Sequence, residues 1–146
     1  MKPENIKVIL DGFDVYLDHI AVATKSIKNS ISFFEMIGLE FDQEEEIVKE
    51  QKVKVRFANI DQRSRLELLE PIEEDGAIYH FLQKKGPGIH HMCFKTTNLP
   101  QMMEALKENG LRLIYDTVQT GAHGMKVNFI HPKSTGGILV ELSQDA

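Results

Sequence analysis

Two similar stretches follow each other along this chain of 146 residues, and this repeat constrains the fold more than any other feature. Each stretch opens with a short β-prone run that holds a histidine: residues 18–23 contain His19, and residues 90–94 contain His91. A Gly-Leu pair then follows each of these histidines by 19 residues. Identical offsets of this kind are typical of a duplicated half-chain.

A third landmark extends the repeat towards the end of each half. Glu67 lies 48 residues after the first histidine and Glu141 lies 50 residues after the second, each inside an apolar run. We therefore expect one α+β domain over residues 1–146, built from two βαβββ modules. The predicted boundaries are residues 16–75 for the first module, 76–87 for a linking helix and 88–144 for the second module.

The spacing of apolar residues within each half predicts its helices and strands. Helical spacing indicates helices over residues 26–37 and 99–109, each ending at a glycine, and a linking helix over residues 77–85. Alternating or continuous apolar runs bounded by Gly and Pro predict the strands. Besides the two opening runs, these strands cover residues 40–48, 53–60, 65–70, 111–115, 126–131 and 137–143.

Four side chains occupy matching positions in the two halves, namely His19, Glu67, His91 and Glu141. If an approximate twofold axis relates the modules, equivalent positions of their first and last strands meet in one cleft. Two imidazoles and two carboxylates suit a divalent cation such as cobalt, manganese, nickel or zinc, whereas the absence of sulfur ligands argues against a structural zinc site. A carboxylate buried in an apolar strand is costly unless a cation supplies the missing charge. The sequence therefore predicts a metal site.

The other histidines fit this pattern less well. His90 competes with His91, but strand alternation places the two side chains on opposite faces, and the register of the first half selects His91. His80 lies in the predicted linking helix and His131 precedes a proline, so both are expected to have solvent or turn roles. For His123 both a functional role and a solvent or turn role stay open.

Composition argues against several classes of function. A net charge of -5 without a basic block argues against a nucleic-acid or anionic-membrane surface. No window approaches the roughly 18 apolar residues of a membrane span, and residues 1–11 lack the features of a secretory or transit signal. Because Cys93 is the single cysteine, no intramolecular disulfide can form, and a reducing cytoplasm is the expected location.

Beyond these patterns, the chain resembles methylmalonyl-CoA epimerases from about residue 17 to residue 143. The most specific matches are GAHG at residues 121–124 and HPKSTGGILVEL at 131–142, with support from LELLEP at 66–71 and GIHHM at 88–92. The resemblance implies the vicinal-oxygen-chelate, or glyoxalase-like, fold, in which two βαβββ modules form a cupped mixed sheet around a metal site. Because that superfamily contains several unrelated activities, the fold alone does not decide the function.

The resemblance also implies an activity, the interconversion of (2R)- and (2S)-methylmalonyl-CoA. This reaction belongs to propionate metabolism and is linked to a cobalamin-dependent mutase. Removal of a proton α to the thioester creates an enolate, and a metal ion would act as a Lewis acid that stabilises its negative charge. Inversion needs proton donors on both faces of the planar intermediate. An acyl-CoA substrate and a homodimeric state are implied in the same way.

The family resemblance points to two candidate catalytic carboxylates in this chain. Glu141 matches a position that serves as metal ligand and acid/base. Some similar proteins carry a second Glu on the third strand, but residues 53–57 hold no carboxylate. Glu67, at a position that is Gln in some members, is then a ligand, the second base or both, and Glu50 is a more distant candidate.

The same resemblance suggests that two Gly- and Pro-containing turns border the substrate. Lys133 and Ser134 would contact the acyl-CoA or its carboxylate, because an acidic protein must supply local cations for the anionic oxygens of CoA. His123 and Gly124 lie in the other turn. The alternative is that both turns are ordinary hairpin connections.

Other functions found on the same fold fit this sequence less well than epimerisation. A glyoxalase I-type lactoylglutathione lyase would use a nearly identical ligand set, but the turn that contains Lys133 argues against it. A dioxygenase needs two histidines and one carboxylate on ferrous iron, which leaves Glu67 unexplained. A non-catalytic ligand-binding protein generally loses the metal set, whereas all four positions are filled here.

Overall fold

The computed structural model describes residues 14–146, and these residues fall into two compact units. The first unit is His19–His91; the second comprises residues 14–18 together with Met92–Ala146. The stretch 1–11, for which no targeting signal is predicted, lies outside the described residues. Among residues 14–146, none of the helices has the length and apolar character needed to cross a membrane.

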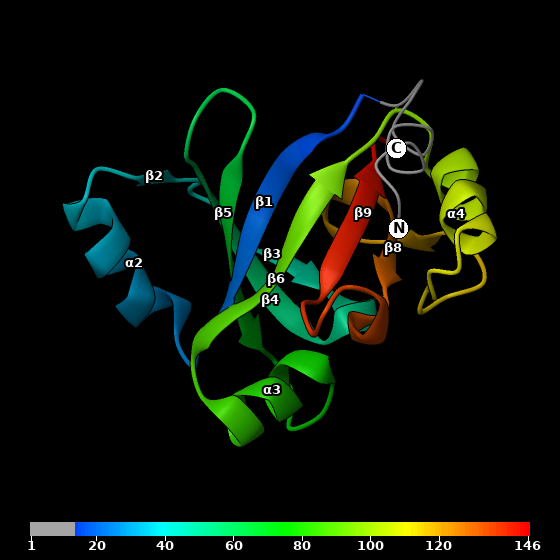
Figure 1. Ribbon diagram of the computed structural model, residues 1–146. Helices are drawn as coiled ribbons and strands as arrows, with labels where there is room; N and C mark the ends of the chain where they lie inside the picture. The colour runs from blue at the N-terminus through cyan, green and yellow to red at the C-terminus, as the bar shows by residue number, and fades with distance from the viewer. Residues whose placement is uncertain (1–13) are drawn as a thin grey trace. The chain divides into compact units, whose positions relative to one another are not determined.

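The first unit is a mixed sheet with two helices, and Figure 1 labels its helices and strands. Its elements are β1 (Tyr16–Ala23), which begins in the second unit, α2 (Ile27–Met36), β2 (Glu40–Phe41), β3 (Glu46–Val48), the 3-10 turn η1 (Lys49–Gln51), β4 (Val53–Asn59), β5 (Arg65–Pro71), α3 (Ala77–Lys85) and the start of β6 (Gly88–Lys95). The strands follow the order β2-β4-β5-β1, and β3 also pairs with β4. Strands β1 and β5 are parallel, and the pairs made by β4 are antiparallel.

Helix α2 covers this sheet through one apolar side. Ile27 and Ile31 of the helix pack with Ala58 of β4 and with Leu66 and Leu68 of β5. The last three side chains sit on two adjacent strands, so a single helix can bury them together. Burying each large aliphatic side chain contributes roughly 1.5–3 kcal/mol, which makes this contact a main support of the strand that carries Glu67.

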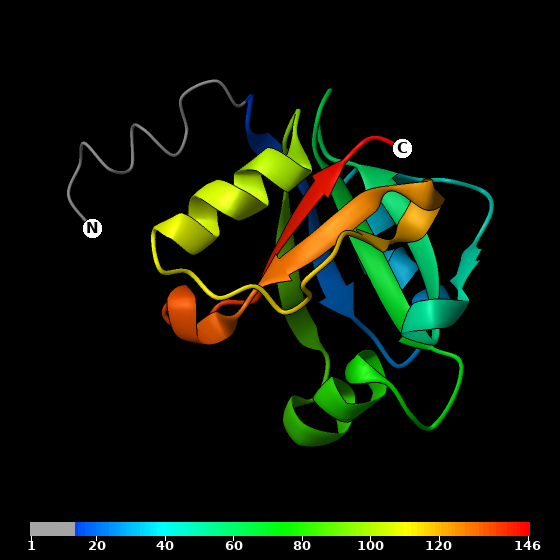
Figure 2. The same cartoon turned by 90° about the vertical axis from the view of Figure 1, so that its right-hand side faces the viewer.

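The second unit repeats the arrangement of a strand, a helix and further strands. It contains the rest of β6, α4 (Leu99–Glu108), β7 (Gln119–Thr120), the 3-10 turns η2 (Ala122–Gly124) and η3 (Pro132–Ser134), β8 (Lys126–Ile130) and β9 (Val140–Gln144). The order is β6-β9-β8-β7, with β6 and β9 parallel. Figure 2 shows α4 beside β8 and β9, where Met102 and Leu106 of the helix pack with Ile130 and Leu142.

The helices of the two units begin in the same way. In α2 the backbone N–H of Ile27 donates to Oε1 of Glu70 in β5, and in α4 the N–H of Leu99 donates to Oε1 of Gln144 in β9, both at 2.8 Å. Each helix also follows a capping side chain that accepts a backbone N–H of its first turn. Shared non-local bonds of this kind support the predicted duplication. The module boundaries 16–75, 76–87 and 88–144, and the single domain over 1–146, stay predictions.

Two predicted strands differ from the structure near their ends. The strand expected over 40–48 is two short strands, β2 and β3, separated by a bend. The strand expected over 137–143 begins only at Val140, because Gly136 and Gly137 have φ values of 77° and 99° and belong to a turn. Positive φ at two successive glycines is incompatible with a regular strand.

The strand predicted over residues 111–115 is wrong. In this segment Leu113 forms only an isolated bridge to Ile130. The side chain of Asn128 accepts a hydrogen bond from the backbone N–H of Tyr115 at 3.2 Å and donates one to its carbonyl at 2.9 Å. The ladder to β8 is half-formed: the N–H of Ile114 donates to the carbonyl of Phe129 at 2.8 Å, but the returning N–H of Phe129 donates to the side chain of Asn128 at 2.7 Å.

Candidate functional site

Three of the four predicted metal ligands meet inside the first unit. His19 of β1, Glu67 of β5 and His91 of β6 are each at most 6% exposed. His19 Nε2 lies 3.4 Å from His91 Nε2 and 3.4 Å from Glu67 Oε2. The structure thus brings two imidazoles and one carboxylate together in a buried cluster, called the His-Glu-His cluster below.

Strand register explains why Glu67 reaches His19. Strands β1 and β5 run parallel with Ala21 opposite Glu67. Side chains two residues apart on a strand share a face, so His19 and Ala21 point to the same side of the sheet. The carboxylate of Glu67 therefore lies on the same face of the sheet as His19, two residues further along the strand direction.

The His-Glu-His cluster fits a divalent cation. Nitrogen ligands about 2.1 Å from one ion lie about 3.0 to 3.4 Å apart, depending on the angle at the metal. The spacing of 3.4 Å between the Nε2 atoms of His19 and His91 falls in this range. Without an ion, two facing imidazoles can share one proton, whereas a cation accepts both lone pairs and also balances the charge of Glu67. The described residues of the first unit could therefore hold a metal with three ligands.

Aromatic contacts hold the first histidine in place. The ring of Phe57 in β4 meets the ring of His19 edge-on, with centroids 6.1 Å apart, and Phe57 pairs with Glu67 in the β4–β5 ladder. The guanidinium of Arg65 lies 4.1 Å from the centroid of Phe57. A cation stacked on this ring restricts its rotation, and the ring in turn limits the rotamers of His19.

Sequence reasoning missed one neighbour of the cluster. His90 is half-buried and His91 is buried, as strand alternation predicts, yet their Nδ1 atoms lie only 2.8 Å apart. Two consecutive histidines were the signal for this contact. His90 is thus a partner of a predicted ligand rather than its rival.

Glu141, the fourth predicted ligand, lies in β9 of the second unit and is also buried. It is opposite Cys93 in the parallel β6–β9 pair. Cys93 follows His91 by two residues, as Ala21 follows His19 in the first half. The local register of Glu141 therefore repeats that of Glu67, while its role as a ligand stays a prediction.

The four predicted substrate contacts lie in two turns of the second unit. His123 and Gly124 belong to η2, before β8, whereas Lys133 and Ser134 belong to η3, after it. These turns stand at opposite ends of one strand, so the four residues do not form a single cluster. Ser134 has a structural bond, because its hydroxyl oxygen accepts a hydrogen bond from the backbone N–H of Arg112 at 2.9 Å.

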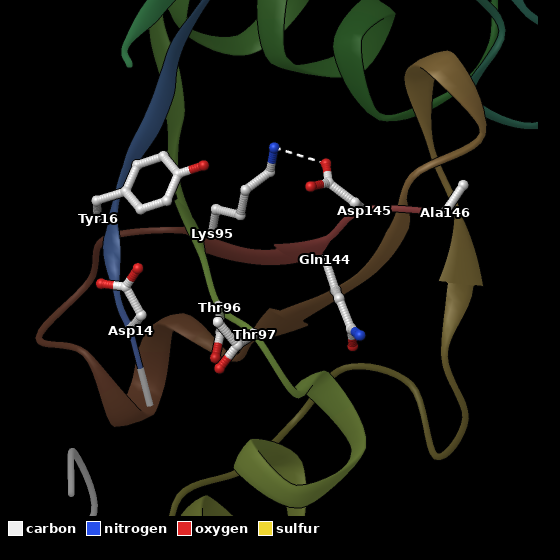
Figure 3. A pocket seen from close by; sticks show the side chains of 8 residues that line it. All are labelled: Asp14, Tyr16, Lys95, Thr96, Thr97, Gln144, Asp145 and Ala146. Carbon is white, nitrogen blue, oxygen red and sulfur yellow. Dashed lines mark ion pairs between the residues drawn. The ribbon is translucent and has the colours of Figure 1, made fainter. Parts of the chain in front are cut away.

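A cavity of about 460 Å³ opens at another part of the second unit (Figure 3). Its lining includes Tyr16, Lys95 and Thr96 and none of the predicted site residues. Lys95 Nζ lies 2.7 Å from Asp145 Oδ1 and 3.7 Å from Asp18 Oδ1, so nearby carboxylates already balance its charge. The cavity adds no group to the predicted site.

Comparisons with known proteins place this chain in a family. Residues 18–129 match the Glyoxalase/Bleomycin resistance protein/Dioxygenase superfamily. The mitochondrial methylmalonyl-CoA epimerase of Mus musculus is 39% identical over 132 residues, which cover 88% of this chain and 72% of the mouse protein. The ethylmalonyl-CoA/methylmalonyl-CoA epimerase of Cereibacter sphaeroides is 33% identical over 131 residues, which cover 88% of this chain and 96% of that protein.

A solved structure agrees with these relatives. A methylmalonyl-CoA epimerase in complex with methylmalonyl-CoA and NH4+ superimposes with a TM-score of 0.84 at 32% identity, covering 89% of this chain and 94% of the other. The expected glyoxalase-like fold is confirmed by this match and by the superfamily. The chain therefore belongs to the Glyoxalase/Bleomycin resistance protein/Dioxygenase superfamily and, within it, to the methylmalonyl-CoA epimerase family.

Proposed function

We propose that this chain interconverts (2R)- and (2S)-methylmalonyl-CoA. One observation carries the proposal: the buried His-Glu-His cluster occurs in a chain whose relatives are named methylmalonyl-CoA epimerases. A solved relative also contains methylmalonyl-CoA itself. In this proposal the cluster would supply one of the two bases and most of the cation site, and Glu141 would supply the second base.

The chemistry consists of taking a proton from the α carbon and returning it on the other face. The proton is weakly acidic, so the enolate that forms must be stabilised by positive charge. A bound divalent cation would supply Lewis-acid stabilisation of that charge. The protein must also exclude water from the reacting carbon, and burial of all three cluster side chains suits this task.

The proposed metal ligands are His19, Glu67 and His91, with Glu141 as the fourth. Support for Glu141 comes from its burial and from a strand register that repeats that of Glu67. Imidazole and carboxylate donors suit cobalt, manganese, nickel or zinc. Metal analysis of the purified protein tests this set of ions.

We assign the two acid/base roles to Glu141 and Glu67. Within residues 19–91, Glu67 is the only carboxylate that is buried, whereas Glu50 is exposed in η1. Residues 53–57 of strand β4, where some similar proteins were expected to carry a Glu, hold no carboxylate. A buried general base near the metal ligands is therefore available from Glu67, which then acts as ligand and base together.

Several further expectations belong to the same proposal. Lys133, Ser134, His123 and Gly124 are proposed to contact the acyl-CoA. Solved epimerases with bound CoA esters support an acyl-CoA partner. A homodimeric state, a cytoplasmic location and a role in propionate metabolism are proposed from the family.

The experiment that tests the function compares two substrates. Protein loaded in turn with each of the four ions is incubated with (2S)-methylmalonyl-CoA, and the two epimers are resolved by a coupled mutase assay. The same preparations are given methylglyoxal and glutathione. The proposal predicts conversion of the first substrate only. Turnover of the second substrate without the first would mean that the chain is a glyoxalase I-type lyase instead.

A further inference from the structure

The ring of His91 has both of its nitrogens engaged. Its Nε2 faces His19 Nε2 at 3.4 Å, inside the His-Glu-His cluster, and its Nδ1 lies 2.8 Å from Nδ1 of His90. A separation of 2.8 Å between two nitrogens requires one donor and one acceptor. The tautomers of the two rings are therefore coupled through this contact.

The direction of this bond follows from the needs of a metal ligand. A neutral imidazole carries its proton on one nitrogen only, and the nitrogen that binds a cation must keep its lone pair. If His91 binds through Nε2, its proton lies on Nδ1 and is donated to Nδ1 of His90. His90 then accepts with its own proton on Nε2. In this direction the short contact stabilises the tautomer of His91 that can bind a metal.

A helix outside the cluster fixes the position of His90. The ring of Phe81, on α3, meets the ring of His90 edge-on, with centroids 5.0 Å apart and planes at 87°. Helix α3 itself is anchored by Ile78 and Leu82, which are buried. An edge-to-face contact of this type is worth roughly 0.5–1.5 kcal/mol and restricts the orientation of both rings. The acceptor nitrogen of His90 is thus held in place by packing.

We infer that His90 is a positioning residue for the metal centre: it accepts the Nδ1 proton of His91 and so presents Nε2 of His91 to the cation. The inference rests on the proposed metal site. It extends that site by one residue and assigns α3 a part in building it. Partners of this kind typically alter metal affinity by 10–100-fold, although they do not touch the metal.

Two substitutions at one position separate hydrogen bonding from packing. His90→Phe keeps a ring against Phe81 but removes the acceptor. His90→Asn places its amide oxygen on the same branch of the side chain as Nδ1, so it can still accept. The matched control is His80→Phe, on the same helix as Phe81, where the replaced side chain is 66% exposed and contacts Asp75.

The first readout is the dissociation constant for cobalt or zinc, measured by competition with a chromophoric chelator. We expect a 10- to 100-fold weaker affinity in His90→Phe, and values within about threefold of the unaltered protein in His90→Asn and His80→Phe. Equal affinity in His90→Phe and the unaltered protein would overturn the inference. Thermal unfolding checks that all variants are folded.

The second readout needs no metal. Long-range ¹H–¹⁵N spectra report which nitrogen of His91 carries the proton, and we expect the Nδ1–H tautomer in the unaltered protein and a mixture in His90→Phe. An Nε2–H tautomer in the unaltered protein would refute the positioning role while leaving the proposed activity intact. Failure of the unaltered protein to bind any divalent ion would instead remove the proposed centre, and the inference with it.

Discussion

Replacing Glu67 by glutamine tests whether this residue is only a metal ligand or also a base. Gln has the shape of Glu and keeps one oxygen donor, but it is neutral and cannot accept a proton from carbon. The two roles therefore respond differently to added metal. A lost ligand charge weakens binding and is overcome by excess ion, whereas a lost base is not.

The structure sets the scale of the first effect. Unit charges at 3.4 Å, the distance from His19 Nε2 to Glu67 Oε2, interact by about 5 kcal/mol at an effective dielectric constant of about 20. Because about 1.4 kcal/mol corresponds to tenfold, about 5 kcal/mol is about 3.5 powers of ten, and neutralising Glu67 should weaken the binding of a cation, which lies closer than this, by at least about three powers of ten. Metal concentrations must be raised accordingly before activity is compared.

At saturating metal the base role becomes visible. General acid–base catalysis contributes about 10²–10⁴ in rate, so Glu67→Gln should interconvert the epimers at least about 100-fold more slowly than the unaltered protein. One epimer should still exchange its α proton with deuterated water through Glu141. Glu141→Gln should show the reciprocal pattern and exchange the other epimer.

The assay is proton NMR of each pure epimer in deuterated water, with Glu70→Gln as the control. Glu70 lies on the same strand, and an amide oxygen in its place can still accept the bond from the N–H of Ile27. This control should epimerise normally. Recovery of full epimerisation by Glu67→Gln at saturating metal would show that Glu67 is a ligand only, and the second base would have to be sought elsewhere.

Three further predictions concern stability. A divalent ion at about 100 times its dissociation constant should raise the free energy of unfolding by about 2.7 kcal/mol, seen as a higher Tm in calorimetry, and an equal rise in His91→Ala would contradict the proposed site. Thr96→Val removes a buried hydroxyl that finds no hydrogen-bond partner within residues 14–146. The free energy of unfolding in urea should therefore stay constant or rise by up to about 1 kcal/mol, and a clear decrease would refute this. A hydrogen bond from Lys52 lowers the pKa of Asp75 from 3.8 to about 2, so its stabilising contribution is present above pH 3.8 and is lost as the pH falls to about 2. Urea titrations over this pH range should show a flatter dependence for Asp75→Asn, and identical curves would exclude the effect.

Much of the architecture could be predicted because local signals and the repeat agree. Helices α2, α3 and α4 lie within two residues of their predicted bounds, since each combines apolar spacing with a glycine or asparagine near its end. The cluster of His19, Glu67 and His91 followed from matched offsets in the two halves rather than from any single residue. Because the halves match, residues that would be weak candidates for a site when taken one by one become a strong candidate set together.

The errors have tertiary causes. The predicted strand at 111–115 failed because the side chain of Asn128 accepts the N–H of Phe129, which a regular ladder would donate to this segment. The contact between His90 and His91 was missed, because alternation describes where side chains leave a strand and not where their rings end. Contacts of this kind depend on rotamers and on a neighbouring helix, which no local pattern encodes.

The most direct measurement is a crystal structure of the cobalt-loaded protein with an anomalous difference map. The proposal predicts one peak at about 2.0–2.2 Å from Nε2 of His19 and His91 and from carboxylate oxygens of Glu67 and Glu141. A peak bound by other residues, or these four side chains directed to separate places around an empty site, would contradict it.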